Sequence, residues 1–357
     1  MSSPAPRTAP VTPPAMSGGG PPQGGDRTGP DRDPRADALE LARTLTPKTR
    51  RDFVLVVPAL DEAPVVPELI GELKRAWSEY GLEGEVLVVD DGSSDGTADL
   101  VEREATGWSS LRVLRHRVNE GKTSALLTAA SETDRTWVIL FDADLQHLPD
   151  EIPRFLAKLQ DGWDIVTGRK VGAYDKRAIS SIYNRLSRRI FRVPVSDLNS
   201  MKAFRREVLE ELHLRRDWHR FFVVLAHARG WSVTEIDISL YPRRAGVSKY
   251  RGPLRILIGL LDLMSVWFLV VFSRKPLLFF GVTGAAMVVA GILVGLVALW
   301  LRFVEQSGFR PLLTLVSLLE VVGFLLFGFG LVAEMIAQLR AEVDALRHRS
   351  PTRPGRS

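Results

Sequence analysis

Two carboxylates, two residues apart, follow a strongly apolar stretch of the chain. Asp142 and Asp144 come directly after the run Val138–Phe141. In an extended backbone, residues i and i+2 point to the same side, so these two side chains can converge on one hard cation. Magnesium or manganese held in this way can bridge a diphosphate. Such acid pairs also occur by chance in turns, but the position after a buried strand favours a metal site.

A second pair of acids ends another apolar run. Asp90 and Asp91 follow Val86–Val89 and lead into a turn rich in glycine and serine. Acids at the carboxyl end of a strand can accept hydrogen bonds from the base edge and the ribose hydroxyls of a nucleotide. The alternative interpretation is an ordinary turn in which Asp95 or Thr97 caps the following helix.

Basic residues supply two further candidates for anion binding. Gly121 and Lys122 look like the end of a phosphate-binding loop, but the first glycine of that motif would fall at His116, so no Walker A motif is present. Lys122 can still reach a phosphate, and a solvated helix start is the open alternative. Between Arg169 and Arg192, eight basic residues accompany a single acid. That run is either a solvated helix face or a surface for anionic headgroups or a lipid phosphate.

The elements that must position these residues form an α/β pattern from Arg51 to about Tyr250. Helical spacing of apolar residues predicts helices over Val65–Tyr80 and Leu148–Leu159, packed on a largely parallel sheet. In such a sheet, functional loops lie at the carboxyl ends of the strands. The predicted strands are Phe53–Val57, Val86–Val89, Leu111–Leu114, Trp137–Phe141 and Ile165–Thr167.

The flanking regions have a different composition. Residues 1–50 are rich in proline and glycine and predict a disordered tail. This tail lacks the apolar core of a secretory signal, so we expect the domain of residues 51–250 to stay in the cytoplasm.

After Tyr250, two apolar runs are long enough to cross a membrane. Leu277–Leu301 has no charge and Pro311–Ala333 has one, so residues 276–338 predict a two-helix transmembrane hairpin. Basic residues flank its two ends, which places residues 339–357 as a basic cytoplasmic tail and the loop Arg302–Arg310 outside. Within residues 251–275, Leu254–Phe272 is apolar but charged in places. An interfacial amphipathic helix is favoured there over a third crossing, which would put the domain of residues 51–250 outside.

Composition excludes several classes of protein. The chain has no cysteine, so disulfides, thiolate nucleophiles and cysteine-bound zinc are excluded, and its six histidines are scattered. Any metal must therefore be held by oxygen. The 47 basic against 42 acidic residues give a net charge of +5, too small an excess for a nucleic-acid binder.

Four ordered motifs resemble the signature of family 2 glycosyltransferases, which have the GT-A fold. They are Pro58–Glu62, Asp90–Thr97, Asn119–Lys122 and Asp142–His147. Three later features narrow the resemblance to polyprenyl-phosphate glycosyltransferases, similar to dolichol-phosphate mannose synthase and GtrB-like proteins. These features are His219–Phe222, Pro242–Tyr250, and Asp262–Leu263 ahead of the two spans. The resemblance covers residues 52 to 337.

The resemblance implies roles for individual residues. The nucleotide-binding residues are Pro58, Glu62, Asp90, Asp91, Lys122 and Asp142. The metal ligands, for Mg²⁺ or Mn²⁺, are Asp142, Asp144 and Gln146. The acceptor phosphate is bound by Arg169, Arg177 and Ser181 and by a closing loop with Arg243, Ser248 and Lys249. The residues expected to act most directly on the reaction are Asp144, Arg169 and Arg177.

Two departures from the family pattern stand out. Leu60 and Asp61 replace the usual Tyr-Asn pair, which removes an aromatic wall beside the base and leaves the nucleotide open between UDP and GDP. The usual cysteine after the acceptor helix is replaced within Asp197–Lys202, a structural position whose loss we do not expect to abolish the chemistry.

The function implied is transfer of a sugar from a nucleotide-sugar to a polyprenyl phosphate, with inversion at the anomeric carbon. A cation at the acid pair offsets the charge on the leaving diphosphate. The acceptor phosphate is already ionised near neutral pH, so no general base is assigned. The expected partners are the donor, the acceptor and the lipid bilayer, in a multi-pass protein of the cell membrane; a homo-oligomer is left open.

Two alternatives compete with this interpretation. A processive polysaccharide synthase of the same fold would need a Gln-x-x-Arg-Trp motif and more spans. A non-catalytic membrane adaptor would show loss of the acid pairs, which are intact.

Overall fold

A computed structural model of the chain describes residues 34–171, 195, 197, 200–212, 221–242, 264, 276–306 and 310–349. It divides the chain into two compact units, residues 1–251 and residues 252–357. The first is a mixed α/β domain and the second contains two long apolar helices.

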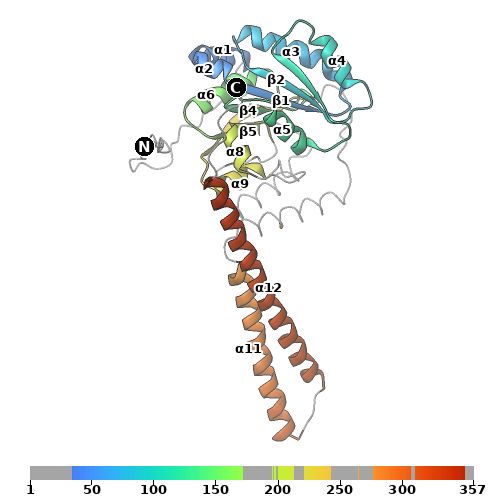
Figure 1. The fold of residues 1–357 in the computed structure, drawn as a ribbon, viewed down its shortest axis with the longest axis vertical. Helices are drawn as coiled ribbons and strands as arrows, with labels where there is room; N and C mark the ends of the chain where they lie inside the picture. Colours follow the sequence, from blue (N-terminus) through green and yellow to red (C-terminus); the bar gives the residue numbers. More distant parts are fainter. Residues whose placement is uncertain are drawn as a thin grey trace, which may run out of the picture. The chain divides into compact units, whose positions relative to one another are not determined.

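A seven-stranded sheet with the order β3-β2-β1-β4-β6-β5-β7 forms the centre of the first unit (Figure 1). Its ladders are parallel except those of β6, which runs antiparallel to both β4 and β5. The carboxyl ends of β1, β2 and β4 therefore meet at one edge of the sheet. The strands are β1 Phe53–Ala59, β2 Glu85–Asp90, β3 Leu111–Arg115, β4 Trp137–Leu140, β5 Ile165–Val171, β6 Lys202–Arg205 and β7 Val233–Ser239.

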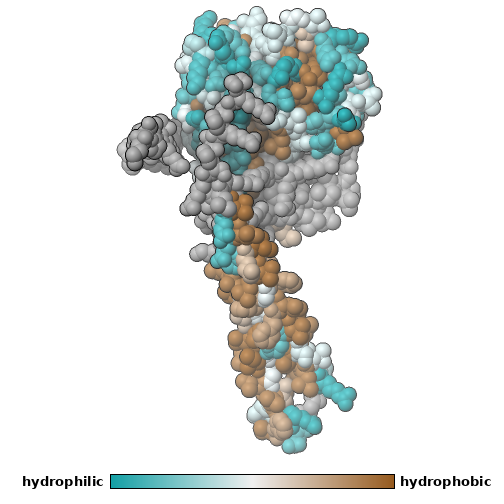
Figure 2. All heavy atoms as spheres, viewed as in Figure 1, coloured by the Kyte–Doolittle hydropathy of each residue, from teal (hydrophilic) through white to brown (hydrophobic). Residues whose placement is uncertain are grey.

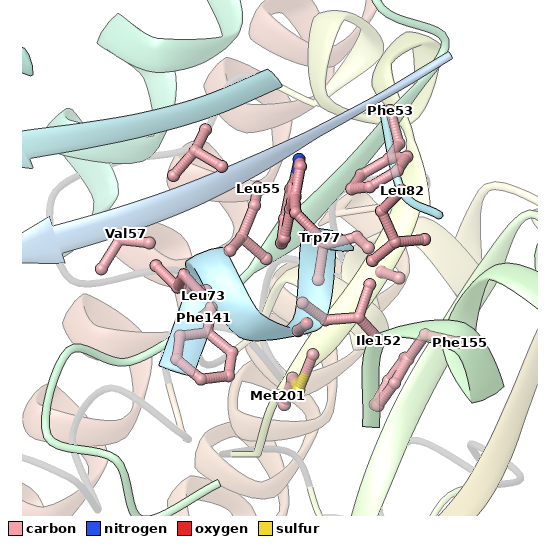
Figure 3. Close-up of a cluster of buried hydrophobic side chains, with 14 of the residues drawn as sticks. Phe53, Leu55, Val57, Leu73, Trp77, Leu82, Phe141, Ile152, Phe155 and Met201 are labelled. Carbon is pink, nitrogen blue, oxygen red and sulfur yellow. The ribbon is translucent and has the colours of Figure 1, made fainter. Parts of the chain in front are cut away.

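Helices cover both faces of the sheet. The side chains of Phe53, Leu55 and Val57 point to one face and pack in a single buried cluster with α3 and α6 (Figure 3). On the opposite face, Phe204 of β6 packs on Phe222 of α9, with ring centroids 4.4 Å apart. After the two N-terminal helices, the described residues of this unit form α3 Val66–Glu79, α4 Thr97–Glu104, α5 Lys122–Ser131, α6 Ile152–Gln160, α8 Arg206–Glu211 and α9 Phe222–Ala228, with short 3₁₀ turns η1 Ala63–Val65 and η2 Pro149–Glu151.

The five predicted strands and the two predicted helices are present with boundaries shifted by a few residues. The helical pattern over Val65–Tyr80 becomes η1 and α3, and the pattern over Leu148–Leu159 becomes η2 and α6. Strands β6 and β7 were not predicted. The sheet is largely parallel, as the sequence pattern indicated, and β6 adds the two antiparallel ladders that make it mixed.

The N-terminal boundary differs from the prediction. Residues 34–50 were expected to be disordered, but α1 (Pro34–Thr44) and most of α2 (Pro47–Arg51) lie there. Ala38, Ala42 and Leu45 join the buried cluster. Proline at the first positions of a helix costs little, because its missing N–H would have no helical partner. A high proline content was therefore a misleading sign of disorder for this segment.

The second unit contains α11 (Pro276–Phe303) and α12 (Arg310–Arg349). Residues 276–303 and 310–339 are each long and apolar enough to cross a membrane, and Figure 2 shows their hydrophobic surface in brown. The two helices approach closely at Gly284, where an added Cβ would lie 2.5 Å from the carbonyl oxygen of Gly323. The predicted interfacial helix of residues 251–275 lies outside the described residues, apart from Met264.

Candidate active site

The two acid pairs lie on neighbouring parts of one sheet edge. Asp90 is the last residue of β2 and is paired in register with Ala59 of β1. On the other side of β1, the register of Val56 with Leu140 brings the end of β4 to the same edge, and Asp142 and Asp144 follow two and four residues later. The parallel register thus brings together the two carboxylate pairs that the sequence singled out.

A hydrogen bond within the Asp142–Gln146 turn orients the side chain of Asp144. The amide of Gln146 donates to Oδ1 of Asp144 over 3.2 Å. Leu145 between them has a φ of +52°, a left-handed conformation that is uncommon for a branched residue. Asp144 is buried, whereas the side chain of Asp142 is 45% exposed. The turn therefore presents one acid to solvent and keeps the other inside.

Lys122, the first residue of α5, forms an ion pair with Asp142. Partial desolvation of this half-exposed side chain would raise the pKa of Asp142, but the charge of Lys122 and its hydrogen bond lower that pKa far below the usual range. Sequence analysis left open whether Lys122 reaches the site or only starts a helix. Its contact with Asp142 brings it into the site.

Asp91 has a different environment from Asp90. Its Oδ1 accepts a hydrogen bond from the amide of Glu120 over 2.9 Å, and its Oδ2 accepts one from the amide of Gly121 over 2.8 Å. Nδ1 of His116 lies 2.8 Å from Oδ1 of Asp91, and Nε2 of the same ring lies 2.9 Å from Oγ1 of Thr128. The buried Asp91 carboxylate thus holds the loop that leads into Lys122, a task that the sequence did not predict.

The loops after β1 and β2 are joined by reciprocal bonds. The amide of Asp61 donates to Oγ of Ser93 over 2.8 Å, and Oδ1 of Asp61 accepts from the amide of Ser94 over 2.9 Å. The amide of Glu62 donates to Oγ1 of Thr97 over 2.9 Å. Asp61 has a φ of +47°, so the backbone turns sharply where these bonds form. The hydrogen bonds between the two loops give this part of the edge a fixed shape.

Asp95 lies just before Gly96, the N-cap residue of α4, and bonds to two backbone amides. Its Oδ1 accepts from the amide of Thr97 over 3.0 Å at the start of α4, and its Oδ2 accepts from the amide of Ala63 over 3.0 Å. Burial alone would raise the pKa of Asp95, but the Thr97 hydroxyl and the two amides lower it. Asp95 thus joins the loop after β1 to the start of α4, and the alternative in which Asp95 or Thr97 is the helix N-cap is wrong, because Gly96 holds that position.

Arg169 and Lys170 extend to opposite faces at the end of β5. The Nη2 of Arg169 donates to Oδ2 of Asp237 on β7 over 2.8 Å. On the other face, Nζ of Lys170 lies 3.8 Å from Oδ2 of Asp197. Two hydrogen bonds fix the backbone of Asp197. Its amide donates to Oε1 of Glu235 over 3.0 Å, and its carbonyl accepts from the Thr167 hydroxyl.

A buried lysine near the acid edge was missed by the sequence analysis. Lys202 begins β6 opposite Leu140 and donates through Nζ to the carbonyl of Ser200 over 3.0 Å. Burial, and after it the charge of Lys122, lowers the pKa of Lys202 to about 7. A lysine inside an apolar strand pattern would have been the one available signal.

Five of the residues predicted to bind the acceptor phosphate lie outside the described residues. They are Arg177, Ser181, Arg243, Ser248 and Lys249. Arg169 is the one predicted phosphate-binding residue that the structure describes.

A divalent cation suits the oxygen donors of the turn. Within the described part of the chain, no three acidic or histidine side chains gather closely enough to hold a metal ion. The two carboxylates and the side-chain amide of Gln146 would therefore hold a hard cation only in part, leaving positions for diphosphate oxygens. The ammonium group of Lys122 at Asp142 already shows that this position accepts positive charge.

Comparisons with known proteins agree with this geometry. The family described as Glycosyl transferase family 2 matches residues 54–213. An undecaprenyl-phosphate 4-deoxy-4-formamido-L-arabinose transferase of Klebsiella pneumoniae is 30% identical over 300 residues, which cover 82% of this chain and 90% of that protein. This chain belongs to glycosyltransferase family 2. A transferase of the same description from Shewanella sediminis is 29% identical over 306 residues, covering 82% of this chain and 90% of the relative.

Solved structures agree on the fold. Glucosyl-3-phosphoglycerate synthase of Mycobacterium tuberculosis, in complex with Mn²⁺ and uridine-diphosphate-glucose, matches with a TM-score of 0.51 at 16% identity, covering 66% of this chain and 82% of that chain. The prediction of a GT-A-like α/β domain followed by two apolar C-terminal helices is confirmed, as is the prediction that the protein is a glycosyltransferase.

Proposed function

We propose that this glycosyltransferase transfers a sugar from a nucleotide-sugar to the phosphate of a membrane polyprenyl phosphate, with inversion at the anomeric carbon. The observation that carries the proposal is the acid pair Asp142 and Asp144, which meets the loops after β1 and β2 at one edge of the sheet. Relatives named undecaprenyl-phosphate transferases align over 82% of the chain and supply the class of acceptor.

The nucleotide lies against the edge formed by β1 and β2. Pro58 and Glu62 flank the end of β1, and Asp90 ends the neighbouring β2. Because these loops are joined by the bonds of Asp61 and Asp95, the base and ribose meet a surface that needs no rearrangement. Lys122 and Asp142 border this surface and face the diphosphate.

The divalent ion is held by Asp142, Asp144 and the side chain of Gln146. Mg²⁺ or Mn²⁺ supplies positive charge that stabilises the diphosphate as it leaves. The comparison structure of glucosyl-3-phosphoglycerate synthase contains Mn²⁺ together with its nucleotide-sugar, which supports a metal in this fold. Lys122 adds positive charge on the protein's side of the same edge.

The acceptor phosphate is held by basic residues at the end of β5 and beyond it. Arg169 stands in β5, and Arg177 and Ser181 follow it in the chain, four residues apart. Arg243, Ser248 and Lys249 complete the proposed set of acceptor residues. A phosphate oxygen is already a competent nucleophile near neutral pH, so the protein's main task is to hold two anions close together.

The two apolar helices attach the enzyme to the membrane in which its acceptor resides. Basic residues precede α11 and are frequent at the end of α12, so both ends of the hairpin lie in the cytoplasm. The catalytic domain and both termini then share the side on which nucleotide-sugars are made.

The experiment that tests this function is a donor panel. Purified full-length protein in detergent is incubated with undecaprenyl phosphate and a set of radiolabelled UDP- and GDP-sugars, and label is measured in the organic phase. One donor is expected to transfer label that depends on both the lipid phosphate and the divalent ion. Label that stays in the aqueous phase for every donor, or that is independent of the lipid, would contradict the proposal.

A further inference from the structure

The ion pair of Lys122 and Asp142 links the first residue of α5 to the turn after β4. The two side chains are 28% and 45% exposed. A pair this accessible contributes little to stability, because ordering two side chains offsets most of the attraction. The ion pair matters because its carboxylate, that of Asp142, is also assigned to the divalent ion.

The backbone beneath Lys122 is fixed. Gly121 has a φ of +93°, a region that favours glycine, and its amide donates to Asp91 over 2.8 Å. The amide of Glu120 donates to the same carboxylate over 2.9 Å, and Nδ1 of His116 lies 2.8 Å from it. Lys122 is therefore held at the site by its main chain, and only its side chain has to move to change partners.

Charge at the turn gives Lys122 a reason to change partners. Asp142 and Asp144 are like charges two residues apart in the chain, and a nearby cation favours the ionised form of a carboxylate. In this structure Lys122 supplies that cation. A divalent ion binding to the same carboxylate would have to displace the ammonium group or share Asp142 with it.

We propose that Lys122 is an internal counter-ion that holds Asp142 in the nucleotide-free enzyme and moves to the donor's diphosphate when the donor binds. Asp142 is thereby released to hold the divalent ion. This proposal rests on the proposed function, which makes the donor a nucleotide-sugar. It adds that binding of the donor promotes binding of the divalent ion. The metal alone binds weakly, and the nucleoside diphosphate strengthens it; by linkage, the metal strengthens nucleotide binding by the same factor.

Binding of Mn²⁺, followed by the electron paramagnetic resonance of the free ion, tests the idea without any transfer reaction. Full-length protein in detergent is titrated with Mn²⁺ alone and again with saturating UDP or GDP. Lys122→Met removes the charge at similar length, and Lys122→Arg retains it. Without nucleotide, Lys122→Met is expected to bind Mn²⁺ about tenfold more tightly than the wild type, and Lys122→Arg like the wild type.

Saturating nucleotide is expected to affect the Mn²⁺ affinities of the wild type and of Lys122→Met differently. Wild-type protein gains Mn²⁺ affinity on adding the nucleotide, whereas Lys122→Met gains much less because it cannot contact the diphosphate. Adding Asp144→Asn to Lys122→Met should remove the extra Mn²⁺ binding, which places that binding at the acid pair. Thermal unfolding of each variant checks that the fold is kept.

The outcomes separate this idea from the proposed function. If Lys122→Met binds Mn²⁺ no more tightly than the wild type while nucleotide-dependent Mn²⁺ binding is intact, the counter-ion role is wrong and the metal-dependent donor site stands. If neither protein binds Mn²⁺ with or without nucleotide, the metal site itself is wrong and both ideas fail.

The carboxylate of Asp91, which accepts hydrogen bonds from the amides of Glu120 and Gly121, offers an independent variant. Asparagine at position 91 has one accepting oxygen, so it cannot accept hydrogen bonds from both amides in the way that the carboxylate of Asp91 does. Asp91→Asn should speed hydrogen exchange at the amides of Glu120 and Gly121 and tighten binding of Mn²⁺ alone, by less than Lys122→Met does. Faster hydrogen exchange with unchanged Mn²⁺ binding would show that the hydrogen bonds accepted by Asp91 do not position Lys122.

Discussion

The Nη2 atom of Arg169 lies 2.8 Å from Oδ2 of Asp237, and the pair joins β5 to β7 at facing positions of their ladder. An arginine expected to bind the acceptor phosphate is thus ion-paired with a carboxylate. The Arg169 side chain remains 50% exposed, so a phosphate can still approach its guanidinium group. Asp237 and the acceptor would then compete for the same cation.

This competition gives a paired prediction. Arg169→Ala should raise the KM for polyprenyl phosphate by roughly tenfold, as expected when a charge-assisted hydrogen bond is lost. Asp237→Asn should leave that KM unchanged or lower it, because the guanidinium group is freed. Donor affinity, measured by calorimetry, should stay constant in both variants. A loss of donor affinity in Arg169→Ala would mean that Arg169 serves the other substrate.

The N-terminal helices predict a sharp boundary for truncation. Removing residues 1–30 should change neither activity nor melting temperature. Removing residues 1–45 deletes α1 and the buried Leu45, and should lower the melting temperature by about 5 °C or more, since deleting buried apolar side chains costs several kcal/mol. Thermal scans of the two truncated proteins measure the difference. Equal melting temperatures would contradict the packing of α1 on the domain.

Asp61 should act as a positioning residue for the donor loops. Asparagine keeps an accepting oxygen for Ser94 and tolerates a φ of +47°, whereas alanine does neither. Asp61→Asn is therefore expected to be nearly normal, and Asp61→Ala to raise the donor KM by roughly tenfold with a smaller effect on kcat. Steady-state kinetics with varied donor separate the two constants. If asparagine is as harmful as alanine, the charge of Asp61 matters more than its bonds to the neighbouring loop.

Membrane topology can be read from single cysteines, because the chain has none of its own. Glu305→Cys, placed after α11, should react only with a reagent added from outside the cell. Glu40→Cys, on α1 of the catalytic domain, should react only after the membrane is made permeable. If Glu305→Cys is labelled only from the cytoplasmic side, the two-span arrangement is wrong and three crossings are favoured.

The sequence predicted the part of the fold that has strong local periodicity. Strands β1, β2 and β4 consist mainly of consecutive apolar residues, β3 contains three apolar residues among its five, and α3 repeats apolar residues at helical spacing, so each was found. Strand β7 was missed because polar residues interrupt its apolar ones, and β6 was missed because its four residues begin with Lys202 and end with Arg205. The antiparallel placement of β6 between β4 and β5 depends on contacts distant in sequence, which no local pattern contains.

The site was predictable to a similar degree. The positions of Asp90, Asp142 and Lys122 at one edge follow from strand ends and motifs that the sequence displays. The task of Asp91 does not, because Asp90 and Asp91 are adjacent identical residues and only the tertiary structure shows which one the amides of Glu120 and Gly121 engage. The same holds for Lys202, whose burial beside the acid edge depends on the pairing of β6 with β4.

The central claim is that a single sugar is transferred to a lipid phosphate at the acid pair. Mass spectrometry of the lipid extract, after incubation with the active nucleotide-sugar and undecaprenyl phosphate, tests it most directly. The expected product has the mass of the lipid phosphate plus one sugar residue. It should be absent in EDTA and reduced by roughly a thousandfold in Asp144→Asn, as expected when a group that stabilises the departing charge is lost. A ladder of longer sugar chains, or the same product at full yield in EDTA, would contradict the account.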